Sequence, residues 1–465
     1  MELCAAAALA LGLILRLWFI AKVARIAGDT LIYGNIAKNW LEHGVYGFSQ
    51  NVTGPVPTLI RLPGYPLFLA ISFRFFGMEH YTAVMYTQVA FDLLTSLLVA
   101  ALARLLFDGR AALSALWLAA LCPFMASYVS APLTETLSLT CVALTFYSLE
   151  RWRSAGLGIN LWLWITSGAM AYAVLLRPEQ GLLAAAVIPA MLWAVLRSPV
   201  KRTSRGLLAR SLRPVVLAAF CVVLSLAPWT LRNWRTFHVF QPLAPRYATD
   251  PGETVPLGFQ RWFRTWAIDF ASTEDVYWNY NGASIDIADL PSRAFDSNDQ
   301  YSRTEVLLHE YNETDNATPS LDKRFDSIAQ ERIHADPLRY YVALPIARLL
   351  NMAFRPRTEM FPIELEWWKW HEHPKQTAFA TAYAALNLAY FVLAGIGLWR
   401  WRRYGWGQSP LLAWSMIGFV SLRCALLLTL DNSEPRYTLE LYPVMLVWAA
   451  AAFAHFKHNA NSITS

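Results

Sequence analysis

The charged residues that could do chemistry in this chain lie at the ends of long apolar segments. Asp29 follows the first such segment, in "GDTLIYGNIAKNW", and Glu135 begins a later one, in "APLTETLSL". Charged groups at membrane depth are costly, so their positions carry information. Carboxylates accept protons, and arginines hold phosphates through paired hydrogen bonds. The candidate acids and arginines are Asp29, Arg61, Glu135, Arg177, Arg232, Glu434 and Arg436.

The two acids nearest the N-terminus also have a structural interpretation. Asp29 could be the N-cap of an amphipathic helix over residues 30–43. Glu135 could cap its own helix, since a helix N-terminus favours a carboxylate.

The arginines have structural alternatives as well. Arg177 and Arg232 could extend to lipid headgroups, and Glu434 could simply pair with Arg436. We expect all these residues on one side of the membrane, and several of the arginines are on the side where basic residues are uncommon. Together, these acids and arginines predict a site that binds a phosphate and transfers a proton.

The composition indicates the class of protein that must position these residues. The chain has 465 residues, of which 56% are hydrophobic and 15% charged, against about 25% charged in soluble proteins. The apolar residues come in blocks of about 20, the length that crosses a bilayer as a helix. The net charge of +6 comes from basic residues beside these blocks, so membrane topology explains it better than nucleic-acid binding. The five cysteines lie in apolar segments without a CxxC pair, so we expect neither disulfides nor a thiolate metal site.

The blocks predict an all-α polytopic membrane protein with about ten or eleven transmembrane helices. The first block lacks a basic region before it, so we expect a retained span and not a signal peptide. The basic loop at 197–213 indicates the cytoplasmic side, and both termini join it. The expected spans are 3–27, 81–106, 111–130, 133–150, 157–176, 181–197, 214–232, 376–399, 411–430 and 436–456.

The opposite, extracytoplasmic face receives two large loops. The first, 28–80, carries Asp29 and Arg61, and the second is an acidic insert of mixed structure. We therefore divide the chain into three parts: an N-terminal membrane module (1–232), an extracytoplasmic loop region (233–375) and a C-terminal membrane module (376–465). Within the insert, 338–354 is apolar but short, and we expect an interfacial or re-entrant helix. Residues 364–373, "ELEWWKWHEH", predict an interfacial aromatic belt.

Four sequence elements resemble those of the GT-C membrane glycosyltransferases, in the branch of protein O-mannosyltransferases and lipid A aminoarabinose transferases. The first two are "GDTLIYGNIAKNWLEHGVYGFS" and "RLPGYPLFLA" in the first external loop. The third is "LAPWTLRNWRTFHVFQPL", and the fourth is "EPRYTLELYPVMLVWAA" before the last span. The four lie in the family's order and extend over nearly the whole chain.

The resemblance implies an inverting transfer of a sugar from a polyprenyl-phosphate carrier to an acceptor outside the cytoplasm. It implies that Asp29 is the catalytic base and that Arg61 holds the lipid phosphate, followed in preference by Arg177, Arg232 and Arg436. Many relatives have an acidic pair after the first span, whereas here Thr30 stands second and leaves Asp29 alone. The supporting residues are Tyr33, Asn35, Tyr65, Glu135, Asn233, Glu434 and Tyr437.

Partners follow from the same interpretation: the lipid-linked sugar donor, membrane lipids, and an acceptor that is a glycan, lipid or protein. No cofactor is expected; His371 and His373 could ligate a divalent cation, but the first loop has no Asp-x-Asp element. One alternative is a transporter or flippase of lipid-linked sugars, with Arg16 as its internal charge. Another is a non-catalytic scaffold whose acidic outer loop binds an envelope partner.

Overall fold

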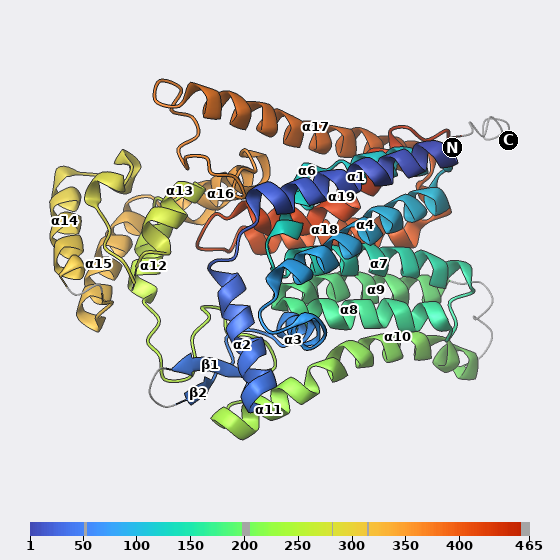
Figure 1. The fold of residues 1–465 in the computed structure, drawn as a ribbon, viewed down its shortest axis with the longest axis horizontal. Helices are drawn as coiled ribbons and strands as arrows, with labels where there is room; N and C mark the ends of the chain where they lie inside the picture. Colours follow the sequence, from blue (N-terminus) through green and yellow to red (C-terminus); the bar gives the residue numbers. More distant parts are fainter. Residues whose placement is uncertain (51–53, 198–204, 281, 314–315, 457–465) are drawn as a thin grey trace. The chain divides into compact units, whose positions relative to one another are not determined.

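The structure of the chain is a computed structural model that describes residues 1–50, 54–197, 205–280, 282–313 and 316–456. Residues 198–204 of the basic loop lie outside this description. The described chain is almost entirely helical (Figure 1), and its two strands form one short hairpin. The prediction of an all-α polytopic membrane protein is confirmed.

The chain forms two compact units. The first comprises residues 1–252, 389–422 and 439–465, and the second comprises 253–388 and 423–438. The division falls inside two long helices, α17 (Pro374–Tyr404) and α18 (Pro410–Leu427).

Six helical segments of the described chain are long and apolar enough to cross a membrane, or seven if the bent pair α5–α6 counts as one span. This result makes the chain a multi-pass membrane protein. The segments are α1 (Glu2–Val23), α4 (Tyr81–Leu106), Pro178–Arg197, which includes α9 (Gly181–Arg197), Ser211–Phe237, α17 and α18.

Every predicted span coincides with a helical segment. Four of the predicted spans, however, do not correspond to any of the six segments that are long and apolar enough to cross a membrane. One is the bent pair α5 (Gly109–Ala120) and α6 (Pro123–Ala126), which continues into η1 (Ser127–Ser130) and is bent by 44°. Proline at the start of α6 explains the break, because it cannot continue the hydrogen-bond ladder of α5. The others are α7 (Glu135–Ser154), the shorter α8 (Leu161–Leu176), and α19 (Tyr442–Ala451) with its preceding η9 (Pro435–Leu441).

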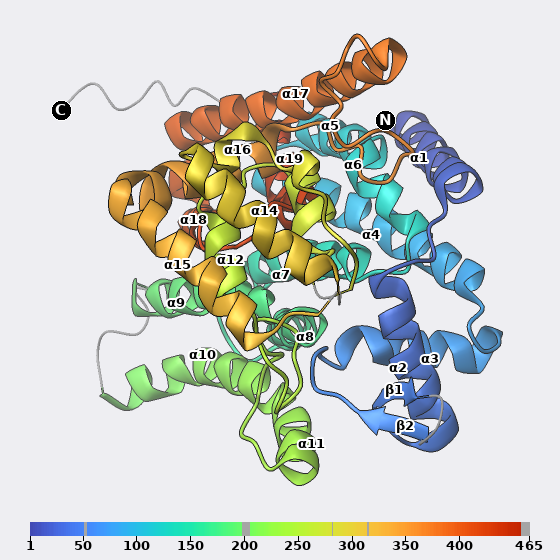
Figure 2. The same ribbon diagram turned by 90° about the vertical axis from the view of Figure 1, so that its left-hand side faces the viewer.

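In the first unit, α7 packs between α4 and α8, and α8 also contacts α10 (Arg205–Ser225), as Figures 1 and 2 show. α10 is followed by α11 (Ala227–Phe237), and a 3₁₀ turn, η2 (Pro178–Gln180), joins α8 to α9. Another, η8 (Trp406–Gln408), lies between α17 and α18.

A buried ion pair joins the first two spans. Arg16 on α1 donates from Nε to Asp92 on α4 at 2.6 Å, and both side chains are fully buried. Arg16 Nη1 also donates to the carbonyl oxygens of Gly12 at 2.7 Å and Ala120 at 2.6 Å. Ala120 ends α5, where carbonyls lack helical partners, so the arginine satisfies a polar group freed by the bend.

The first loop, residues 28–80, folds into two helices and the hairpin. α2 (Asp29–His43) is followed by β1 (Gly47–Gln50) and β2 (Gly54–Pro57), which pair antiparallel, and by α3 (Gly64–Phe76). Two glycines allow close packing of this loop. A Cβ on Gly34 would lie 1.8 Å from the Tyr81 hydroxyl, and one on Gly64 would lie 2.5 Å from backbone atoms of Leu175 in α8. The glycine of the "PGYP" element is therefore required for α3 to reach α8.

The second unit contains a helical layer with an aromatic core. α12 (Leu257–Arg264) packs against α15 (Pro319–Ala335), and α14 (Asn298–Asn312) packs on α15. Trp262, Phe263, Trp266 and Phe325 form the centre of the buried cluster. Shorter turns complete this unit: α13 (Phe270–Ser272), a π-helix η4 (Thr273–Tyr277), η5 (Ile287–Asp289) and η6 (Ser292–Ala294).

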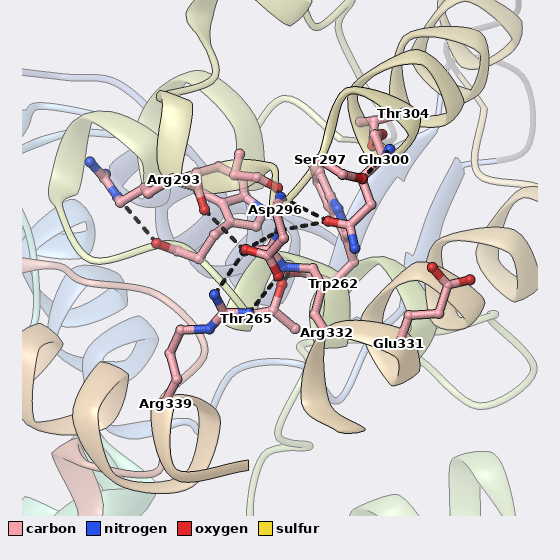
Figure 3. Close-up of polar contacts among 12 residues, drawn as sticks. Trp262, Thr265, Arg293, Asp296, Ser297, Gln300, Thr304, Glu331, Arg332 and Arg339 are labelled. Carbon is pink, nitrogen blue, oxygen red and sulfur yellow. Dashed lines mark hydrogen bonds and ion pairs between the residues drawn. The ribbon is translucent and has the colours of Figure 1, made fainter. Parts of the chain in front are cut away.

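A buried arginine network holds the ends of these helices together (Figure 3). Arg332, on α15, donates to the carbonyl oxygens of Ala294 at 2.9 Å and Arg293 at 3.0 Å, and to the side chain of Gln300 at 2.9 Å. Asp296 lies 3.3 Å from the same guanidinium and also accepts two hydrogen bonds from Arg339. These contacts join α14, α15 and η7 within the unit.

The apolar segment 338–354 forms η7 (Arg339–Ala343), a π-helix, and α16 (Leu344–Phe354). It is not among the segments that pass the test for a span. One side of this helix is buried, and the other exposes large apolar side chains: Tyr341, Val342, Ile346, Leu350 and Phe354. Such a face suits a helix that lies in the membrane interface. The interfacial placement, and the aromatic belt at 364–373, stay predictions.

Candidate functional site

Asp29 and Arg61 form an ion pair in the first loop, residues 28–80. Arg61 Nη2 donates to Asp29 Oδ1 at 2.8 Å, and the side chains are 20% and 23% exposed respectively. Asp29 is the first residue of α2, where the helix dipole favours a carboxylate. The structure assigns the N-cap to Gly28, with φ of 55°, so the alternative of Asp29 as a side-chain N-cap is wrong. The acid is therefore held at the helix start by Arg61 and remains partly open to solvent.

Tyr33 lies one helical turn after Asp29 and is nearly buried, at 9% exposed. The Arg61 guanidinium carbon lies 5.7 Å from its ring centroid. Burial raises the pKa of the Tyr33 hydroxyl to about 12; Arg61 and Arg177 oppose this rise, and Asp29 and Glu135 add to it. The ring is therefore within electrostatic reach of two acids and two arginines.

The second acid and arginine of this group also form an ion pair. Arg177 Nη1 donates to Glu135 Oε1 at 2.8 Å, and its Nε donates to Glu179 at 2.6 Å. Glu440, from the segment before α19, lies 3.5 Å from the same Nε. Glu135 is the first residue of α7, where the helix dipole favours a carboxylate as the structural alternative proposed, and it also pairs with Arg177. Arg177 is engaged by three carboxylates and does not extend to headgroups as the alternative proposed.

Tyr65 connects the two ion pairs to the membrane helices. Its ring lies 5.2 Å from that of Tyr33, and its hydroxyl donates to Gln88 on α4 at 2.8 Å. Gln88 in turn donates to the carbonyl oxygen of Ala131 at 2.9 Å, four residues before Glu135. These contacts fix the position of the first loop against the membrane helices.

Arg232 occupies a structural position in the same unit. It donates to the carbonyl oxygens of Thr58 and Tyr46, each at 2.7 Å, on either side of the hairpin. Its side chain also donates to Asn233, which is fully buried and donates to the carbonyl oxygen of Gln241 at 2.8 Å. The headgroup alternative for Arg232 is wrong, because its guanidinium faces the loop.

Asn35 also holds the hairpin. It accepts from the backbone N–H of Ser49 at 2.9 Å and donates to the Ser49 hydroxyl at 3.2 Å. Like Arg232, it contributes to the shape of the first loop, and none of its hydrogen bonds in the structure reaches Asp29 or Arg61.

The three remaining candidates belong to the second unit. Arg436 pairs with Glu434, as the structural alternative proposed, and lies 5.9 Å from the Tyr437 ring centroid. The Tyr437 carbonyl oxygen accepts from Arg423 at 3.1 Å. These residues form a local cluster within their own unit.

Sequence reasoning did not include three residues that the structure brings to these sites. Glu179 and Glu440 contact Arg177, and Asp92 pairs with Arg16. Each had a signal: Glu179 lies two residues after Arg177, and Asp92 is the one acid in the predicted span 81–106. Arg16, the internal charge of the transporter alternative, is committed to structural contacts. Among the described residues no group of three His, Cys, Asp or Glu has a geometry that could hold a metal ion.

Comparison with known proteins relates the chain to membrane glycosyltransferases. Residues 57–229 match the model of the dolichyl-phosphate-mannose-protein mannosyltransferase family, a range that includes Arg61, Tyr65, Glu135 and Arg177. No curated protein sequence matches the chain.

The comparison with solved structures also gives matches. The Archaeoglobus fulgidus oligosaccharyltransferase, tethered to an acceptor peptide with the NVT sequon, has a TM-score of 0.49 at 13% identity, covering 96% of this chain and 49% of its own. ArnT from Cupriavidus metallidurans bound to undecaprenyl phosphate has a TM-score of 0.38 at 15% identity, covering 91% of this chain and 76% of its own. The chain therefore spans about half the length of the oligosaccharyltransferase. The predicted resemblance to the GT-C membrane glycosyltransferases is confirmed.

Proposed function

We propose that this protein is an inverting glycosyltransferase that moves a sugar from a polyprenyl-phosphate carrier to an acceptor on the extracytoplasmic side of the membrane. The observation that carries the proposal is the Asp29–Arg61 ion pair, at 2.8 Å, beside Tyr33 and partly open to solvent. The description of the matching family names a dolichyl-phosphate-linked sugar, which agrees with this class of donor. On this proposal both termini are cytoplasmic.

The two members of the pair have complementary tasks. Arg61 would bind the donor phosphate and offset the charge that develops on the bridging oxygen. When the phosphate binds Arg61, the attraction between Arg61 and Asp29 weakens. The Asp29 carboxylate can then accept the proton of the acceptor. Asp29, the proposed base, and Arg61, the proposed phosphate ligand, are therefore adjacent before either substrate binds.

The reaction is a single displacement. The acceptor oxygen forms a bond with the anomeric carbon, and the bond from that carbon to the phosphate oxygen breaks. The electron pair leaves with the lipid phosphate, and the acceptor proton passes to Asp29. The anomeric configuration is inverted, and no covalent enzyme intermediate is required.

The test is sugar transfer by the Asp29→Asn variant in membranes supplied with labelled carrier-linked sugar. Asparagine keeps the size of the side chain and cannot accept the proton, so we expect transfer to fall by a factor of about 10² to 10⁴. Glu79→Gln, which alters an exposed acid of the same loop that pairs with Lys38, is the matched control and should retain activity. Wild-type rates from Asp29→Asn would remove the proposed base.

Product analysis separates this function from transport. A transporter or flippase would return the sugar still attached to its carrier, whereas the proposed enzyme yields a glycosylated acceptor and free lipid phosphate. Activity of the purified single chain would also exclude a purely scaffolding role.

A further inference from the structure

The second unit buries an arginine whose guanidinium is only partly used. Arg348, on α16, is 1% exposed. Its Nη1 donates to the carbonyl oxygens of Arg264 at 3.2 Å and Ala267 at 3.1 Å. Its Nε and Nη2 are buried and have no hydrogen-bond partner in the described chain. Buried donors are nearly always bonded in folded proteins, so these two require an explanation.

The two unused donors lie on the same edge of the guanidinium. In arginine the N–H of Nε and one N–H of Nη2 point in parallel, which is the arrangement that binds two oxygens of one phosphate or carboxylate. The carbonyl contacts through Nη1 hold the group in place, and the donors of this edge are buried without a hydrogen-bond partner in the described chain. Arg348 is therefore oriented as a bidentate anion ligand.

A second arginine lies close to the first. The Arg264 side chain is 26% exposed, its guanidinium carbon lies 5.3 Å from the Tyr340 ring centroid, and its Nε lies 3.3 Å from Asp431. Burial, together with the charge of Arg264, lowers the pKa of Arg348 to about 10, and the charge of Asp431 opposes this shift. Two guanidinium charges thus lie near one carboxylate, which favours a further anion.

We propose that Arg348 and Arg264 form a binding site for a phosphate group in the second unit, separate from the Asp29–Arg61 pair. Arg348 supplies the bidentate edge, and Arg264, which is partly exposed, supplies the second charge. The proposal does not depend on the glycosyl-transfer reaction and would survive its failure.

The phosphate has two possible sources, a lipid headgroup or a free phosphate. The outer face of η7 and α16 exposes Tyr341, Ile346 and Leu350, which would contact the acyl chains of a phospholipid. A free phosphate would use the arginines alone. Both sources share the same chemistry at the guanidinium groups.

Thermal unfolding of the full chain, delipidated in dodecyl maltoside, tests the site. Inorganic phosphate and a short-chain phosphatidylglycerol are titrated separately, and the affinity of each is taken from the rise in Tm. We expect at least one of them to raise the Tm of the wild type. Arg264→Gln keeps the backbone carbonyl that Arg348 uses and removes the second charge, so it should weaken the affinity about tenfold or more.

Arg303→Gln is the matched control, since Arg303 is an exposed arginine of the same unit that pairs with Glu331 and Asp299. It should bind as the wild type does. A response to phosphatidylglycerol alone identifies a lipid headgroup, and a response to inorganic phosphate identifies a free phosphate. If neither ligand raises the Tm, or if Arg264→Gln binds as tightly as the wild type, the donors are satisfied by water and the proposal is overturned.

Discussion

At the scale of single residues, the candidate site consists of charges that neutralise one another. Asp29 pairs with Arg61, Glu135 with Arg177, and Tyr33 lies in the field of all four. Partial exposure distinguishes the first pair from the second. Asp29 and Arg61 are open enough to meet a substrate, whereas Glu135 and Arg177 are 2% and 11% exposed. We therefore assign the chemistry to the first pair and support of the site to the second.

The Arg177→Met variant tests that supporting role. It removes the guanidinium that contacts Glu135, Glu179 and Glu440, so we expect a loss of about 3–5 kcal/mol in the free energy of unfolding. Adding Glu440→Gln should restore part of this loss, because it removes one of three neighbouring negative charges. Thermal unfolding of both single variants and the double variant measures the coupling. A double variant no more stable than Arg177→Met would contradict the proposed arrangement.

At the scale of elements, the first loop is held at both ends of its hairpin. Arg232 binds the carbonyl oxygens of Tyr46 and Thr58, and Asp250 accepts from the Thr58 hydroxyl at 2.7 Å and the Leu59 N–H at 2.8 Å. These contacts come from a segment nearly two hundred residues away. They fix the position of the hairpin. Arg61 follows the hairpin in the chain and pairs with Asp29.

The Arg232→Lys variant separates this clamp from a phosphate ligand. Lysine keeps the charge but lacks the planar fork that reaches two carbonyl oxygens. We expect a loss of about 1–2 kcal/mol in stability, with the KM for the lipid-linked donor nearly unchanged. Unfolding and donor titration are measured on the same preparation. A large rise in donor KM at wild-type stability would instead support the predicted phosphate contact.

The Arg16–Asp92 pair sets the packing of α1, α4 and the bent α5. Asp92→Asn leaves a buried guanidinium without its counter-charge, and we expect it to cost about 3–5 kcal/mol. The double variant Arg16→Met with Asp92→Leu removes both charges and should be more stable than Asp92→Asn. Thermal unfolding in detergent compares the three proteins. If the double variant is the least stable of the three, the Arg16–Asp92 ion pair stabilises the fold by more than the neutralisation of two buried charges.

At the scale of the whole molecule, each unit uses a different source of stability. The first relies on apolar helix packing with a few buried ion pairs, and the second on an aromatic core tied by arginine networks (Figure 3). The second unit also contains a carboxyl group in an unfavourable environment. Burial, with the charges of Asp289, Glu274, Glu366 and Asp269, raises the pKa of Asp275 from 3.8 to about 6.

This shift predicts a dependence of stability on pH. Between pH 3.8 and about 6 the folded chain binds more protons at Asp275 than the unfolded chain, so the contribution of Asp275 to stability falls as pH rises. Asp275→Asn removes the penalty, and we expect it to stabilise the protein by about 1–2 kcal/mol at pH 8 and by little at pH 4. Urea or thermal unfolding at both values checks this. Glu305→Gln, at an exposed acid of the same unit, should not reproduce the difference.

The sequence alone was sufficient for the fold class, because spans of about 20 apolar residues have few alternatives to a membrane helix. Helices form most of each predicted span, and Asp29 lies at the start of α2, as the end of the first apolar block indicated. The ordered motifs also predicted the family resemblance. These features depend on local composition and order, which a linear sequence carries directly.

The tertiary structure decided which charges meet. Asp29 and Arg61 are 32 residues apart, Glu135 and Arg177 are 42, and the sequence offered several arginines for either acid. Only the packing of α3 against α8, made possible by Gly64, shows which arginine contacts which acid. The fold of the first unit likewise assigns Arg232 to the hairpin. Pairing of distant charges depends on side-chain directions in three dimensions, and no spacing in the sequence encodes those directions.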